Sequence, residues 1–162
     1  MSDKKIVFHQ LSQDFYKEHT HLVEMADKPG HDKGRGYGVL LVEVLGYKFA
    51  IPLRSKMSMN HPGNFTTKIH SPEGKKVRHG LDYTKAVIIT EDRFIITQRE
   101  FMLADKSDYV KINDNEHKII ADFEKFIRRY INAVNKNDQN ILRNYQYSTF
   151  QNYHAEFGLI HK

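Results

Sequence analysis

The sequence predicts an α+β fold, with β-strands in the first two thirds of the chain and helices in the last third. Two apolar runs, Val39–Val44 and Lys48–Leu53, flank Gly46 and are rich in β-branched and aromatic residues, which predicts a β-hairpin. Apolar residues from Ile119 to Val134 recur at helical spacing, so we expect a long amphipathic helix in the C-terminal part of the chain. The 162 residues suit one domain, residues 1–162, with a sizeable core.

The remaining elements of the first hundred residues follow from shorter patterns. Lys4–Phe8 places Ile6 and Phe8 on one face and predicts a short first strand. Ser12 is the expected N-cap of a short helix that ends near His19. The continuous apolar run Lys85–Thr90 predicts a central strand, and the next strand is expected at Arg93–Thr97.

The other segments predict a long loop in the middle of the chain and helices toward its C-terminal end. Ser55–Gly80 contains two Pro, three Gly and no clear periodicity, so we expect a long functional or mobile loop there. Asn113 and Glu116 have the spacing of a capping box at the start of the long helix. Ile141–Phe157 predicts a final aromatic-rich helix, within a C-terminal helical extension over residues 136–162.

Composition limits the classes of protein. The chain has no Cys, which excludes a disulfide framework, a thiolate zinc site and a cysteine nucleophile. No apolar run approaches the roughly 18 residues of a membrane span, and the N-terminus lacks a signal-peptide core, so a cytoplasmic location without a membrane partner is expected. The net charge of +5 mildly favours a polyanionic partner, and the nine Tyr and ten Phe offer faces on which bases can stack.

A candidate phosphate site lies where the predicted hairpin begins and ends. A tight hairpin brings both ends to the same side of the sheet, so Arg35 should lie near Arg54 and Ser55. Two guanidinium groups and a hydroxyl can hold a phosphate. The glycines of Gly34–Gly38 fit neither a P-loop nor a dinucleotide fingerprint, because a strand follows them instead of a helix. The alternative, to which we give equal weight, is that Gly34–Gly38 is only a flexible segment that leads into the strand.

The ten histidines raise the question of a metal site. The chain has no HExxH motif and no pair of His one helical turn apart beside a carboxylate, so we expect no metal and no cofactor. His61 is a candidate proton shuttle, although a lone loop His more often has no such role. Lys75–His79 is interpreted first as a solvated basic loop and second as a nucleic-acid contact.

Cleavage of RNA would need no cysteine nucleophile, metal or cofactor. The substrate supplies its own nucleophile, the ribose 2′-hydroxyl, and the protein has only to align it, stabilise charge and exchange protons. On this interpretation the catalytic candidates are Arg35, Ser55 and His61. The candidate RNA-binding residues are Lys33, Tyr37, Arg54, Lys56, Phe65, Lys75, Lys76, Arg78, Tyr83 and Lys85.

Three segments carry a resemblance to a known family: GVLLVEVLGYKFAIPLRS, the opening KKIVFHQLSQDFY and the later DYTKAVIIT. Together they resemble the toxins of type III toxin–antitoxin systems, the ToxN/AbiQ/CptN family, and most closely the CptN-type members. The resemblance runs from Lys4 to about Val134. It implies a compact, partly open antiparallel β-barrel, MazF/Kid-like and SH3-like, with peripheral helices. It also implies a metal-independent, sequence-selective endoribonuclease that leaves 2′,3′-cyclic phosphate ends.

The same resemblance implies the partners. These are cellular or phage RNA substrates and a repeated, pseudoknotted antitoxin RNA, which the enzyme processes and then binds in a closed toxin–RNA assembly. Some members of the family abort phage infection, so phage defence is an implied role.

Carried over residue by residue, the family's basic catalytic position falls on Arg35 and its hydroxyl position on Ser55. ToxN-like members have Lys and a Thr-Ser pair there, whereas this chain has Arg35 and Arg54-Ser55. Arginine does not carry protons at neutral pH, because its pKa is above about 12. Arg35 therefore keeps an electrostatic role, and proton transfer passes to His61, Tyr37 or another group. If the loop register shifts by two, Lys33 takes the basic position.

Three alternatives remain open at this point. A non-catalytic RNA-binding barrel would use the same basic rim without cleaving RNA. A MazF-like toxin neutralised by a protein antitoxin would present an apolar groove instead of a broad cationic surface. An unrelated structural adaptor is the third and least favoured alternative.

Overall fold

The hairpin expected around Gly46 forms the centre of the observed sheet. The computed structural model describes residues 6–25, 38–103 and 105–159. Strands β2 (Val39–Val44) and β3 (Tyr47–Met57) pair antiparallel from Val39↔Pro52 to Val44↔Tyr47, which confirms the predicted hairpin. Leu45 and Gly46 both have positive φ, 55° and 82°, which is the backbone geometry of a two-residue type I′ turn. The turn therefore fixes the register of the central pair.

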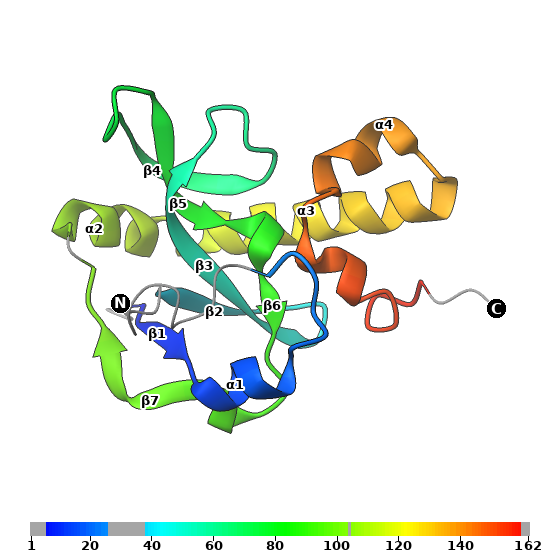
Figure 1. Cartoon of the computed structure of the whole chain (residues 1–162), viewed down its shortest axis with the longest axis horizontal. Helices are drawn as coiled ribbons and strands as arrows, with labels where there is room; N and C mark the ends of the chain where they lie inside the picture. The colour runs from blue at the N-terminus through cyan, green and yellow to red at the C-terminus, as the bar shows by residue number, and fades with distance from the viewer. Residues whose placement is uncertain (1–5, 26–37, 104, 160–162) are drawn as a thin grey trace.

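The sheet has seven strands in the order β4-β5-β3-β2-β1-β7, and β6 pairs with β3 beside this path (Figure 1). Every recorded pairing is antiparallel. The other strands are β1 (Phe8–Leu11), β4 (Asn64–His70), β5 (Val77–Asp82), β6 (Val87–Ile88) and β7 (Ile95–Phe101).

The expected barrel is replaced by an open sheet. Among the described residues no pairing joins the two edge strands, β4 and β7. The chain leaves β7 and forms helix α2 (Lys106–Asp114), which packs against β4. Lys111 on this helix donates to the Thr67 carbonyl of β4 at 3.1 Å, so the helix occupies the place where a closing strand would pair.

The long loop expected over residues 55–80 is also corrected. It contains β4 and most of β5, which pair with each other from Asn64↔Asp82 to His70↔Val77. β4 is an edge strand made of Asn, Thr, Lys and His beside two apolar residues, so its sequence carries little apolar alternation. The run Lys85–Thr90 is likewise not a full strand, because the 3-10 turn η1 (Tyr83–Lys85) precedes the short β6.

The longest helix, α3 (Glu116–Lys136), lies across the back of the sheet in Figure 1. Its 21 residues bury one apolar face, and Phe123 meets Phe49 of β3 edge-to-face at 5.1 Å. Each large apolar side chain buried in this way contributes about 1.5–3 kcal/mol. The expected capping box is not formed: Asn115 is the N-cap of α3, and Asn113 lies in α2 and accepts from the Ile6 amide.

The short N-terminal helix α1 (Gln13–Glu18) begins as predicted, with Ser12 accepting from the Phe15 amide at 3.3 Å. The first strand lies later than expected, at Phe8–Leu11. Within the described ranges, no helix combines the length and apolar character needed to cross a membrane.

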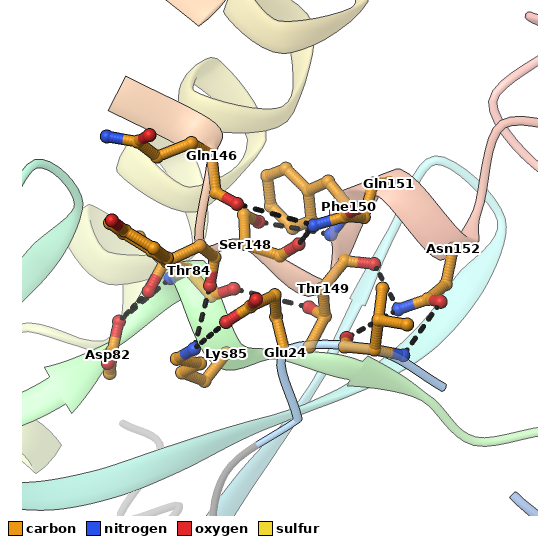
Figure 2. A network of polar contacts seen from close by, with 12 residues as sticks. Glu24, Asp82, Thr84, Lys85, Gln146, Ser148, Thr149, Phe150, Gln151 and Asn152 are labelled. Carbon is orange, nitrogen blue, oxygen red and sulfur yellow. Dashed lines mark hydrogen bonds and ion pairs between the residues drawn. The ribbon is translucent and has the colours of Figure 1, made fainter. Parts of the chain in front are cut away.

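The chain after α3 does not form the expected helix over residues 141–157. It forms three separate short elements, the helix α4 and two 3-10 turns. The Thr149 hydroxyl lies at the Thr84 carbonyl oxygen (Figure 2) and at that of Ala86. The Tyr153 hydroxyl accepts from the Ile88 amide at 3.1 Å. These side-chain contacts satisfy backbone groups of the segment around η1 and β6 and attach the end of the chain to the sheet. The elements are α4 (Gln139–Leu142), η3 (Arg143–Tyr145) and η4 (Thr149–Asn152), and η2 (Asp92–Phe94) precedes β7.

Candidate functional site

A buried carboxylate lies at the end of β5. Asp82 is 0% exposed and accepts from Arg54 Nη1 at 2.7 Å. Its Oδ1 also accepts from the Thr84 amide at 3.0 Å and the Thr84 hydroxyl at 2.6 Å, and His61 Nε2 lies 2.7 Å from the same oxygen. We call these four residues the Asp82 cluster. Without such partners a buried carboxylate would be costly, so the four groups depend on one another.

The pairing of three strands brings the cluster together. Arg54 on β3 lies opposite Gly80 on β5, two residues before Asp82. A Cβ at Gly80 would lie 1.9 Å from the Phe65 carbonyl oxygen, so this glycine permits the close approach of β4. Asp82 then caps η1 through the Thr84 amide. The cluster therefore depends on a glycine that lets β4 and β5 pair closely.

The charge state of Asp82 results from opposing effects. Burial raises the pKa of this carboxyl, but hydrogen bonds from His61, Thr84 and Arg54 outweigh burial and hold the pKa below its usual value. Asp82 is therefore an acceptor at neutral pH, and the Nε2–H of His61 donates to it. That contact assigns the tautomer and leaves Nδ1 of the imidazole as the nitrogen that can take a proton.

His61 and Arg54 line a cavity of about 540 Å³, which we call the His61 cavity. Lys85 and Arg143 add two further cations to its wall, and Glu24 adds one carboxylate. Lys85 is held in place by the Tyr147 carbonyl at 2.7 Å and by Glu24 at 3.4 Å, as Figure 2 shows for Glu24. The excess of cations beside an oriented imidazole suits a phosphate group.

A second hollow, of about 580 Å³, continues from the first and shares Ser58 and Asn60 with it. It is lined by Lys56, Lys75 and Lys76, three of the predicted RNA-binding residues, and we call it the lysine hollow. All three side chains are exposed. The structure thus brings together cations that are up to twenty positions apart in the sequence.

A third hollow, of about 300 Å³, lies on the other side of Arg54 and contains the predicted Ser55. Phe101 lies on its wall, so we call it the Phe101 hollow. Arg54 lines both this hollow and the His61 cavity. The predicted catalytic residues Ser55 and His61 are therefore neighbours of the same arginine but lie in different hollows.

The described residues that line the three hollows do not include four other predicted site residues. Lys33, Arg35 and Tyr37 lie outside the described residues. Tyr83 was expected to stack on bases, and this is wrong: it is 3% exposed and packs against Phe123 at 5.5 Å.

Two predicted RNA contacts also have roles within the fold. Phe65 is half-buried and packs against the core. Arg78 donates to the Met59 carbonyl at 2.8 Å and to the Thr66 hydroxyl at 3.0 Å. These contacts place Arg78 beside the turn that leads to His61.

Sequence reasoning missed Asp82, Thr84 and Arg143. The Asp-x-Thr spacing of the first two is a local capping signal that could have been found. The connection to His61 and Arg54 spans 21 and 28 residues and carries no local signal. Among the described residues, no group of three or more His, Asp or Glu is arranged to hold a metal ion.

No family model matches the chain, and no curated protein matches it. A similar solved structure is described as "New insights into the mechanism of bacterial Type III toxin-antitoxin systems: selective toxin inhibition by a non-coding RNA pseudoknot". The two chains are 15% identical with a TM-score of 0.47, over 78% of this chain and 80% of that chain.

Proposed function

We propose that the protein is an endoribonuclease that cleaves RNA in the His61 cavity, as the toxin of a type III toxin–antitoxin system. The observation that carries the nuclease proposal is an imidazole fixed by a buried carboxylate, next to an arginine bound to that same carboxylate. The assignment to a toxin–antitoxin system rests on the resemblance of the sequence to the ToxN/AbiQ/CptN toxins.

The chemistry follows from the positions of the two side chains. His61 takes the proton of the ribose 2′-hydroxyl at Nδ1, and the 2′-oxygen attacks the adjacent phosphorus. The bond from phosphorus to the 5′-oxygen breaks, water protonates that oxygen, and a 2′,3′-cyclic phosphate remains. Arg54 uses one nitrogen for Asp82 among the described residues, so its other N–H groups can bind the phosphorane oxygens.

The lysine hollow extends the binding surface along the RNA backbone. Lys56, Lys75 and Lys76 supply charge without base recognition, since phosphate contacts position a strand but do not specify its sequence. Lys85 and Arg143 serve the same purpose inside the His61 cavity. A strand bound across both hollows would pass Ser58 and Asn60.

The sequence resemblance adds roles and partners to this proposal. Arg35 would stabilise the phosphorane beside Arg54, and Ser55 would orient the phosphate or the 2′-hydroxyl. The partner would be a repeated, pseudoknotted antitoxin RNA that the enzyme processes and that then inhibits it in a closed assembly. No metal or cofactor is required for the step, and phage defence is the implied biological role.

The test is a cleavage assay of purified protein on mixed RNA in excess EDTA, followed by end-group analysis. Discrete fragments with cyclic phosphate ends are expected from the wild type and from His117→Ala, a control at an exposed position of α3. His61→Ala should produce them at least about a hundredfold more slowly, with circular dichroism checking that it folds. Intact RNA despite tight binding would contradict the nuclease and favour the non-catalytic RNA-binding module.

A further inference from the structure

The Phe101 hollow combines an apolar wall with hydrogen-bonding groups, and apart from Arg54 and Ser55 its lining residues have no role in the chemistry described above. Leu53, Phe101 and Leu103 supply its apolar surface, and Lys68, His79 and Asp105 supply polar groups. A flat apolar surface with a few converging polar groups is how proteins bind single-stranded RNA bases. We propose that this hollow binds one base of the RNA substrate and selects a base with an exocyclic amino group over uracil. The inference rests on the proposed function, because it assigns sequence selectivity to that RNA-cleaving enzyme.

The aromatic surface depends on the glycine at the start of β2. A Cβ at Gly38 would lie 2.5 Å from Cδ1 of Phe101, so the ring rests directly on this backbone. Phe101 is half-buried at the end of the edge strand β7. The ring is therefore held in place while remaining part of the hollow wall, as a stacking surface requires.

The carboxylate of Asp105 is the first acceptor. Its Oδ1 accepts from the amide and the hydroxyl of Ser107, and its Oδ2 accepts from Lys68 Nζ at 2.9 Å. A carboxylate offers about four acceptor positions, so one position on Oδ2 is left. Hydrogen bonds from Ser107 and Lys68 hold the pKa of Asp105 well below its usual value. The side chain is 39% exposed, so the remaining position is accessible to an N–H group of a ligand.

His79 supplies a second acceptor in the same hollow. The Thr67 hydroxyl donates to the His79 carbonyl at 3.0 Å, so the contact between this hydroxyl and Nδ1 at 2.9 Å has Nδ1–H as its donor. Burial lowers the pKa of His79, although Asp108 opposes this effect, and the ring is neutral at pH 7. Its Nε2 is then an acceptor with no protein donor recorded among the described residues.

The two acceptors, the Asp105 carboxylate and His79 Nε2, favour a base whose edge carries N–H donors. Adenine, cytosine and guanine carry an exocyclic amino group, whereas uracil has carbonyl oxygens at the corresponding positions. Lys68 is the cation beside these acceptors, and its donation to Asp105 places it at the same edge of the hollow. Because Arg54 lines both hollows, a phosphate bound to Arg54 in the His61 cavity leaves a neighbouring base within reach of the Phe101 hollow.

The test measures binding apart from cleavage, using four short single-stranded RNAs with 2′-O-methyl groups, one for each base. The wild type should bind at least one of the A, C or G strands about tenfold or more tightly than the U strand. Asp105→Asn keeps an N-cap for α2, because Asn caps as well as Asp, but replaces an acceptor with an N–H donor. This variant should reduce that ratio to near one. Asp114→Asn, an exposed change at the other end of α2, should leave the ratio unchanged.

A second variant tests the stacking surface. Phe101→Leu should weaken binding of all four strands about fivefold or more while keeping the order of preference. Equal affinity for the U strand, or an unchanged ratio in Asp105→Asn, would overturn the inference. If the protein prefers one base but never cleaves RNA, the proposed function is refuted and the base site stands. If cleavage depends on His61 but no base is preferred, the base site is refuted and the proposed function stands.

Discussion

The hollows on either side of Arg54 differ in the aspartate that serves them: Asp82 lies behind the His61 cavity and holds two of its lining residues, whereas Asp105 lines the Phe101 hollow itself, beside the buried Asp108. Asp82 is 0% exposed and binds the Arg54 and His61 side chains and the Thr84 amide. The Asp105 side chain is 39% exposed and keeps an acceptor position for a ligand. A buried carboxylate fixes the geometry of its neighbours, whereas an exposed one can exchange partners. The difference assigns chemistry to the His61 cavity and recognition to the Phe101 hollow.

Removing the charge on Asp82 should have the largest effect on stability. Asp82→Asn leaves Arg54 and His61 without their common partner, so we expect the free energy of unfolding to fall by about 3 kcal/mol. Urea unfolding followed by circular dichroism measures the change. Asp105→Asn is the matched control and should change the midpoint little. Equal losses in the two variants would contradict the distinction between the hollows.

The next prediction concerns the shape of the cation. Arg54→Lys keeps a positive charge but loses the planar fork that can bind Asp82 and a phosphate together. We expect the cleavage rate to fall about a hundredfold while the fold is kept. Lys68→Arg, in the Phe101 hollow, should leave the rate on a cleaved strand nearly unchanged. A fully active Arg54→Lys enzyme would show that the fork has no role in the reaction.

The two hollows should also respond to acid in different pH windows. The pKa of Asp82 is lowered by folding, so its contribution to stability is complete above about pH 4 and is lost as the pH falls further. The pKa of His79 is also lowered, so the unfolded chain takes up a proton first and stability falls as the pH drops below about 6.5.

Urea unfolding between pH 3 and pH 8 separates these contributions. His79→Gln should flatten the dependence just below pH 6.5 and leave the steeper loss below pH 4. Asp82→Asn should do the opposite. A wild-type curve that is flat from pH 7 to pH 4 would count against the lowered pKa of the partly buried His79.

The smallest expected effect is on the salt dependence of RNA binding. Replacing Lys75 or Lys76 with Ala removes one phosphate contact from the lysine hollow, so the slope of log affinity against log salt should fall by about 0.7 per contact. The cleavage rate at saturating protein should not change. An unchanged slope would place the RNA backbone elsewhere on the protein.

How far the sequence predicts this molecule depends on the range of each interaction. The central hairpin and the helix over Ile119–Val134 were predictable because their periodicity and turn residues are local. β4 was missed because an edge strand of Asn, Thr, Lys and His has no apolar alternation to detect. The expected helix over residues 141–157 was wrong because Thr149 and Tyr153 bond to distant backbone groups, which no helical pattern encodes.

The candidate site divides in the same way. His61 was predicted for its chemistry and Arg54 for its charge, but their common partner was not predicted. Asp82 reaches Arg54 because β3 pairs with β5, and His61 lies 21 positions before it in a segment that the sequence predicted to be irregular. Tyr83 was misassigned because an aromatic next to basic residues suggests stacking, whereas its neighbours in space are Phe123 and Phe126.

The central claim is that the Asp82 cluster cleaves RNA through His61. Single-turnover cleavage of one defined RNA in excess EDTA, at saturating wild-type or His61→Ala protein, tests it most directly. We predict that the variant binds the RNA as the wild type does and cleaves it about 10²–10⁴-fold more slowly. A variant that cleaves at the wild-type rate would show that the reaction takes place without His61 and would place the active site elsewhere.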